Sequence, residues 1–169
     1  PNGLIARQLP THEVRWGQLD MSGAVAETLR VGGALCVEAG PGTGKTFAYL
    51  VPALVHLEAE RASRVVVCTR TKQLQEQIFR KDLPFLASLM SSEVATALLK
   101  GRENYLCLRR WEILVREMSD GLERDRLTSL ASLGRWVFDT KTGDIEENSA
   151  FLAQDDAREL WSRLSDSPT

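Results

Sequence analysis

A glycine-rich loop is the part of the sequence whose residues could most directly do chemistry. Residues 39–46 read Ala-Gly-Pro-Gly-Thr-Gly-Lys-Thr. Gly42 and Gly44 allow a tight turn whose backbone N–H groups can point at phosphate oxygens. Lys45 can reach the β- and γ-phosphates of a nucleotide, and the Thr46 hydroxyl is a ligand for Mg²⁺. The loop therefore predicts a site for ATP and Mg²⁺.

The loop fits the general phosphate-binding pattern except at Ala39, where the strict pattern has its first glycine. Kinases, GTPases, AAA-type ATPases and helicases all use such a loop, so it does not select among them. Lys45 and Thr46 are the predicted catalytic residues. The predicted phosphate cradle consists of Gly42, Thr43, Gly44, Lys45 and Thr46.

The elements that must position the loop alternate between short β-branched runs and helical patterns. This alternation is typical of an α/β fold with a parallel sheet, here an incomplete one. After residue 107 the strand signal ends, and apolar residues such as Leu130, Leu133 and Val137 recur at helical spacing. The predicted elements are a helix through Met21 and Leu29, strands at 34–38 and 64–68, helices at 47–57 and 72–80, a less clear strand at 94–99, and a final helix at 155–164.

Composition and charge exclude several classes of protein. The chain has 169 residues, of which 43% are hydrophobic and 26% charged, as in ordinary globular domains. No apolar run is long enough to span a bilayer. Three cysteines at wide spacing argue against a disulfide framework and for a reducing compartment. The basic residues are in excess before residue 110, which permits a polyanionic partner without requiring one.

Three further stretches resemble one family of helicases. Residues 15–21 are similar to the Q-motif of superfamily-two helicases, in its R-x-G-Q-x-x-M form. Residues 69–77, followed by Lys-Asp-Leu-Pro at 81–84, resemble motif Ia of the DinG and XPD-type helicases. Residues 100–107 resemble the K-G-R-x-N-Y-x-C segment of the same family. The bacterial DinG type is the nearest resemblance, and the eukaryotic XPD-like branch is second.

The resemblance implies an ATP-dependent DNA helicase with RecA-like motor domains that moves 5′ to 3′ on single strands. By this resemblance Gln18 contacts adenine and Arg15 lies beside it. The resemblance places Thr69, Thr71 and Gln75 along the path of single-stranded DNA, and the nearby basic residues Lys100 and Arg102 are further candidate phosphate contacts. The residues alone leave simpler interpretations open. Gln18 could be an ordinary exposed residue at a helix start, and Thr69 or Thr71 could merely cap the next helix.

Cys107 is, by the same resemblance, the first of four ligands of a 4Fe–4S cluster. Such a cluster needs four thiolates. Cys36 and Cys68 lie in predicted strands, where a free cysteine is usually a small buried hydrophobe. We therefore expect Cys107 to be a free thiol in this chain, and residues 107–169 to be loosely packed without the cluster. The alternative is that Cys107 is only a core residue of a helix.

The sequence also lacks expected parts of such a motor. We find no Asp-Glu-x-His string to hold Mg²⁺ and orient water; Asp155 and Asp156 are the nearest acidic pair. We therefore expect residues 1–106 to be part of motor domain 1 and residues 107–169 to begin the iron–sulfur domain, in an N-terminal piece of a longer helicase that binds nucleotide without hydrolysing it.

Other expectations follow from the family. A DinG-type protein would be cytoplasmic and associated with the bacterial nucleoid, whereas an XPD-like one would be nuclear. It would act on single-stranded DNA, away from membranes, with other repair or replication proteins as further candidate partners. The alternatives are a nucleotide- or nucleic-acid-binding module that never turns over, or another P-loop ATPase.

Overall fold

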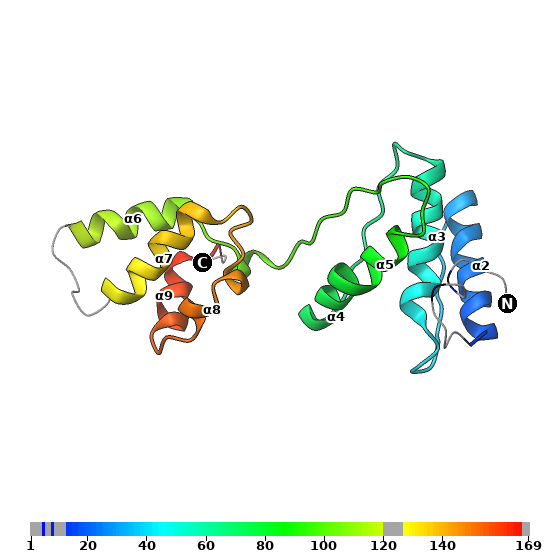
Figure 1. Cartoon of the computed structure of the whole chain (residues 1–169), viewed down its shortest axis with the longest axis horizontal. Coiled ribbons are helices and arrows are strands. Elements are labelled where there is room, and N and C mark those ends of the chain that lie inside the picture. Colours follow the sequence, from blue (N-terminus) through cyan, green and yellow to red (C-terminus); the bar gives the residue numbers. More distant parts are fainter. Residues whose placement is uncertain (1–4, 6–7, 9–12, 120–126, 167–169) are drawn as a thin grey trace. The chain divides into compact units, whose positions relative to one another are not determined.

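The computed structural model describes residue 5, residue 8 and residues 13–119 and 127–166. The chain divides into two units, Pro1–Leu98 (unit 1) and Leu99–Thr169 (unit 2) (Figure 1). In these described ranges, no helix combines the length and the apolar character needed to cross a bilayer. Each unit is described here by itself.

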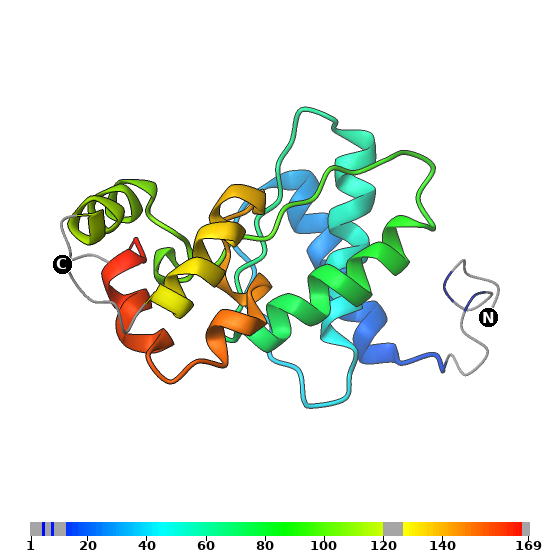
Figure 2. The same ribbon diagram turned by 60° about the vertical axis from the view of Figure 1, so that its left-hand side comes forward.

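Unit 1 is built from helices. The helices α2 and α3 lie side by side in both ribbon views (Figures 1 and 2), and the elements α4, η1 and α5 follow one another without a break. The helices predicted around residues 47–57 and 72–80 are confirmed by α3 and by α4 with η1. The bounds are α2, Trp16–Val31; α3, Lys45–Ala59; α4, Lys72–Gln77; η1, a π-helical turn, Ile78–Asp82; and α5, Leu83–Ala87.

A small apolar core joins α3 to η1 and α5. In this core the rings of Phe47 of α3 and Phe85 of α5 stack nearly parallel, with their centroids 6.0 Å apart. Because the glycine loop leads directly into α3, this core also fixes where the loop lies. The buried residues of the cluster are Leu50, Leu54, Ile78 and Leu86.

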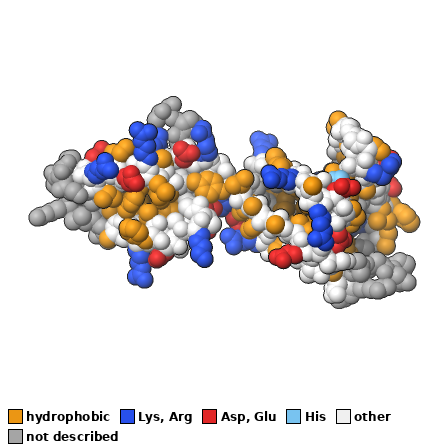
Figure 3. Space-filling view, turned by 90° about the horizontal axis from the view of Figure 1, so that it is seen from above, with side chains coloured by type: hydrophobic (Ala, Val, Ile, Leu, Met, Phe, Trp, Pro, Cys, Tyr) orange, Lys and Arg blue, Asp and Glu red, His pale blue; other side chains and the backbone are white. Residues whose placement is uncertain are grey.

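The predicted parallel sheet is not formed in the described residues. Residues 34–38, 64–68 and 94–99 carry no strand assignment, and Cys36 and Cys68 are exposed instead of buried. A strand needs a neighbour to pair its backbone N–H and C=O groups, and these segments do not pair with one another. Their apolar side chains therefore stay at the surface, where Val66 is 83% exposed and Leu35 44% (hydrophobic side chains are orange in Figure 3).

Unit 2 is a helical unit. Within residues 99–119 and 127–166, two short 3₁₀ turns and four α-helices surround its core. The final helix predicted at 155–164 is confirmed by α9 within two residues. The bounds are η2, Arg102–Asn104; α6, Leu108–Ser119; α7, Leu127–Asp139; η4, Ile145–Glu147; α8, Ser149–Leu152; and α9, Ala157–Leu164.

The core of unit 2 corrects the expectation of loose packing after residue 107. Leu133, Phe151 and Leu160 are fully buried, and Trp161 packs edge-on against both Trp136 and Phe151. Phenylalanine and tryptophan rings bury large apolar areas, so they stabilise a small unit more than aliphatic side chains would. The other buried members of the cluster are Leu114, Leu130, Ile145, Ala157 and Leu164.

Unit 2 begins at Leu99. The reason is a pair of isolated backbone bridges. Tyr105 pairs with Asp144, and Leu106 pairs with Ser165. These bridges hold the segment before α6 against two later parts of unit 2, so residues 99–106 pack with the helices that follow them.

Candidate nucleotide-binding site

The glycine loop closes on itself at the start of α3. Gly42 and Gly44 have φ angles of 76° and 78°, in the left-handed region that disfavours side chains with a Cβ. The Lys45 ammonium donates to the carbonyl oxygens of Ala39 and Gly40, at 2.9 and 2.8 Å. Lys45 therefore lies over the loop, where a positive charge can meet phosphate oxygens.

Thr43 makes another hydrogen bond within the loop. Its hydroxyl donates to the Gly40 carbonyl oxygen at 3.0 Å. At the other end of the loop, Gly44 is the N-cap of α3, and the first turn of that helix presents backbone N–H groups that the helix itself cannot pair. A helix N-terminus of this kind attracts anions.

Two residues from the start of α2 are bonded to the same loop. The Arg15 guanidinium donates to the carbonyl oxygen of Gly42, and the Gln18 amide donates to that of Gly44 at 2.9 Å. Gln18 is half-buried, which differs from the simple interpretation of an exposed residue at a helix start. The structure thus brings the predicted adenine-side residues together with the predicted phosphate cradle.

Gly44 has a further reason to lack a side chain. A Cβ built at this position would lie 2.2 Å from the Gln18 amide nitrogen. Any larger residue would displace the Gln18 side chain from the loop and would also be strained at φ 78°. The close approach of α2 to the loop therefore depends on glycine at this position.

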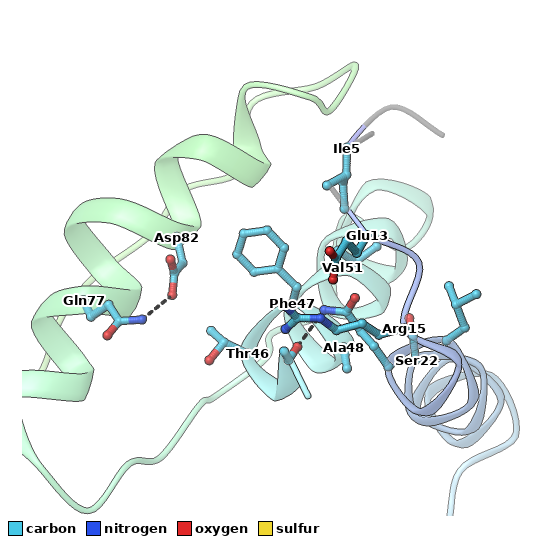
Figure 4. Close-up of a pocket in the computed structure, with 13 residues that line it drawn as sticks. Ile5, Glu13, Arg15, Ser22, Thr46, Phe47, Ala48, Val51, Gln77 and Asp82 are labelled. Atoms are coloured by element: carbon cyan, nitrogen blue, oxygen red, sulfur yellow. Dashed lines mark hydrogen bonds between the residues drawn. The ribbon is translucent and has the colours of Figure 1, made fainter. Parts of the chain in front are cut away.

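A pocket of about 430 Å³ opens beside the loop (Figure 4). Its wall combines apolar side chains with a few polar groups, as small-molecule sites usually do. Neither Phe47 nor Asp82 was assigned a role from the sequence, and both line it. The lining residues are Ile5, Glu13, Arg15, Gln18, Leu19, Ser22, Gly44, Thr46, Phe47, Ala48, Val51, Gln77 and Asp82.

Two polar residues that line this pocket, Thr46 and Asp82, act on the phenol of Tyr49 next to it. Burial raises the pKa of the Tyr49 phenol, a hydrogen bond with the Thr46 side chain opposes that rise, and the negative charge of Asp82 adds to it. Tyr49 therefore keeps its proton at neutral pH and interacts with both Thr46 and Asp82. No motif pointed to Tyr49, because its three-residue spacing from Thr46 on a helix is common.

The predicted DNA contacts of unit 1 lie at the start of α4. The Thr71 hydroxyl accepts a hydrogen bond from the Leu74 N–H at 3.3 Å, which is the capping role left open by the sequence. The Thr69 hydroxyl donates to the Thr71 carbonyl oxygen at 3.1 Å. Both threonines thus shape the turn into α4, while Gln75 is half-buried on that helix.

Lys100 does not lie as a DNA contact would. Its side chain is only 2% exposed, and its ammonium is 2.7 Å from Asp144 Oδ2 and 2.6 Å from Glu146 Oε2. To bind a phosphate, this ammonium would have to leave both carboxylates, and breaking a buried ion pair is costly. We therefore remove Lys100 from the candidate DNA contacts. Arg102, two residues later, is exposed in the turn η2.

Cys107 precedes α6 and is half-buried in unit 2. Its N–H donates to the Leu164 carbonyl oxygen at 2.8 Å, and its own carbonyl accepts from the Trp111 N–H. The other two cysteines of the chain belong to unit 1. In the described ranges no group of three histidine, cysteine or acidic residues could hold a metal. The residues of this chain alone therefore do not fit a four-thiolate cluster.

The arrangement around residues 39–46 is that of a P-loop nucleotide-binding protein. A closed glycine loop stands at a helix N-terminus and ends in lysine and threonine, and a glutamine from another helix donates a hydrogen bond to it. Comparison with known proteins narrows this class. The family model for DEAD/DEAH box helicases matches residues 22–133. The chain belongs to this helicase family, whose motor domains are RecA-like.

Individual relatives agree with the family. The chain is 38% identical over 146 residues to the ATP-dependent DNA helicase YoaA of Haemophilus influenzae, covering 86% of this chain and 22% of the relative. It is 34% identical over 161 residues to the 3′-5′ exonuclease DinG of Bacillus subtilis, covering 95% and 17%. It is 37% identical over 149 residues to the ATP-dependent helicase DinG of Mycobacterium tuberculosis (strain H37Ra), covering 79% and 22%. The chain spans about a fifth of the length of these relatives.

Proposed function

We propose that this chain is the nucleotide-binding N-terminal part of an ATP-dependent DNA helicase. The observation that carries the proposal is the pair of hydrogen bonds from Arg15 and Gln18 to the glycine loop, beside a pocket that the loop helps to line. Lys45 would hold the β- and γ-phosphates, and the Thr46 hydroxyl would be a ligand of the Mg²⁺ that neutralises them. Gln18 would face the adenine.

Binding without turnover is the expected behaviour of the chain alone. Hydrolysis needs a group that orients the attacking water, and the sequence has no Asp-Glu-x-His string to supply it. The unpaired segments 34–38 and 64–68 would pair with further strands of a RecA-like sheet in the complete motor domain. The bacterial relatives favour a cytoplasmic DinG-type protein over a nuclear one.

Replacing Gln18 with alanine tests the adenine assignment. We expect ADP affinity to fall by about ten-fold while GDP affinity, already weak, changes little, because one hydrogen-bonding partner of the base is lost. Isothermal titration calorimetry on the 169-residue chain measures both nucleotides. Gln73→Ala is the matched control, since Gln73 is an exposed glutamine on α4 outside the pocket lining. Equal losses for ADP and GDP would remove Gln18 from the base contacts.

Single-stranded DNA is the proposed polymer substrate of the complete protein, with 5′ to 3′ movement. Thr69, Thr71, Gln75 and Arg102 are the proposed contacts, and other repair or replication proteins are candidate partners. Hydroxyl, amide and guanidinium groups bind phosphates without reading bases. Affinity for single strands should therefore fall steeply with salt and vary little with base sequence. Fluorescence anisotropy with several oligonucleotides at two salt concentrations checks this, and strong sequence dependence would contradict it.

Cys107 is proposed as one ligand of a 4Fe–4S cluster in the complete protein only, since this chain supplies no other thiol in unit 2. Cys107→Ser in the complete protein should then lower its iron content while nucleotide binding persists, because the glycine loop belongs to unit 1. Iron analysis of the purified variant is the measurement. A full complement of iron would show that Cys107 is an ordinary half-buried residue before α6.

A further inference from the structure

Asp82 is a charged side chain of unit 1 that the sequence motifs leave without a role. The residue is 7% exposed, which is rare for an aspartate, and it lines the same pocket as Thr46. Its carboxylate accepts a hydrogen bond from the Gln77 amide, whose nitrogen is 3.2 Å from Oδ2 (Figure 4). An amide partner leaves the full negative charge in place, so something else must account for a buried carboxylate here.

The backbone places Asp82 toward this pocket by an unusual route. Residues Ile78–Asp82 form a π-helical turn, and the side-chain amide of Gln77, just before the turn, donates to the carboxylate of Asp82 at its end. Pro84 explains the turn, because proline lacks the N–H that would bond the carbonyl of Arg80. Single π-helical turns occur frequently at functional sites.

A capping role does not explain the carboxylate. Asp82 stands at the N-cap position of α5, but its side chain makes no capping hydrogen bond with that helix, all of whose residues are described. Its backbone at this position is already helical, with φ −73° and ψ −45°, whereas a capping aspartate has extended backbone. The carboxylate therefore does not cap α5.

The charge of Asp82 has a direct consequence for a nucleotide in this pocket. A carboxylate and a polyphosphate repel each other, and the repulsion is stronger where water is excluded. A divalent cation between the carboxylate and the phosphates turns this repulsion into a net attraction. Mg²⁺ in proteins is typically held by one or two carboxylates together with substrate phosphates and waters. Thr46, the proposed Mg²⁺ ligand, lines the same pocket as Asp82 (Figure 4).

We propose that Asp82 is a positioning residue that selects the magnesium complex of the nucleotide over the free nucleotide. Its carboxylate would help to hold the Mg²⁺ that accompanies the phosphates, and the hydrogen bond from Gln77 would keep the carboxylate in place. This inference rests on the proposed function, because it needs a nucleotide in the pocket. By this inference the nucleotide site includes, besides the glycine loop, a residue from the Lys-Asp-Leu-Pro stretch at 81–84.

Asp82→Asn tests the inference, with ADP titrated into the 169-residue chain in the presence of Mg²⁺ and again in EDTA. The asparagine oxygen can still accept from Gln77, so the fold should persist. For the original chain we expect Mg²⁺ to strengthen ADP binding. In Asp82→Asn this gain should shrink by about ten-fold, while ADP binding in EDTA should become about three-fold tighter, because a like charge is gone.

Glu58→Gln is the matched control, since it also turns a carboxylate of unit 1 into an amide. Glu58 accepts from the Ser91 and Ser92 N–H groups and lies outside the pocket lining, so its Mg²⁺ dependence should equal that of the original chain. A purely structural role for Asp82 would weaken binding equally with and without Mg²⁺, and that result would overturn the inference. Unchanged binding in both conditions would overturn it too.

Two further outcomes stay distinguishable. If the original chain binds no ADP in either condition, the proposed function fails, and the inference fails with it. If Asp82→Asn does not fold, the inference can be tested on the original chain by NMR spectroscopy with bound Mn²⁺·ADP. Paramagnetic broadening should then be stronger for the Asp82 amide signal than for that of Glu58. Equal broadening of the two signals would overturn the inference.

Discussion

Replacing Lys45 with alanine should weaken ADP binding to the 169-residue chain by about 10- to 150-fold. The reason is the loss of a charge-assisted hydrogen bond to phosphate, which is worth about 1.5–3 kcal/mol. The Lys45 ammonium already lies over the loop, 2.8 Å from the Gly40 carbonyl oxygen, so little rearrangement is needed to meet an anion. Calorimetry with ADP and Mg²⁺ measures the effect.

The control for Lys45 is Lys72→Ala, which removes an equal charge from α4, outside the pocket lining. Its effect on ADP binding should be within two-fold, since charges at the surface are screened by salt. Thermal unfolding of Lys45→Ala should remain close to that of the original chain, because the Lys45 side chain is exposed. Equal ADP affinity in the original chain and Lys45→Ala would contradict the cradle assignment.

The glycine loop could be predicted because its signal is local. The glycines, Lys45 and Thr46 lie within a few residues, so sequence spacing alone places them together. The bond from Arg15 to Gly42 joins residues 27 apart, and the resemblance to the Q-motif placed Arg15 only beside the adenine contact. Asp82 escaped prediction for a geometric reason, because a helical pattern assumes 3.6 residues per turn and a π-helical turn shifts the register.

The predicted sheet is the opposite case. The local sequence favours strands, but these segments have no neighbouring strands to pair with in the described residues. Val65, Val66 and Val67 have strong β-propensity, yet propensity reflects packing against neighbouring strands more than a backbone preference. Lys100 shows a third case. Its partners Asp144 and Glu146 lie more than 40 residues later in the chain, so no local pattern around Lys100 indicates these ion pairs.

Lys100→Ala should destabilise unit 2 by about 3 kcal/mol, the lower end of the cost of breaking a buried ion pair. The substitution leaves two carboxylates facing each other without a cation, and the Asp144 side chain is only 12% exposed. We take the lower end because the Glu146 side chain is 37% exposed and water can solvate it. The same substitution should leave ADP binding unchanged, since the glycine loop belongs to unit 1.

Urea unfolding followed by tryptophan fluorescence measures this effect, because Trp111, Trp136 and Trp161 all belong to unit 2. Trp161 is the most direct reporter, since its indole N–H donates to the Glu103 carbonyl oxygen at 2.8 Å, three residues after Lys100. Lys141→Ala removes an exposed lysine from the same unit and should shift the midpoint little. If both variants unfold at the same urea concentration, Lys100 does not hold unit 2 together, and its ammonium becomes available again as a candidate contact to DNA.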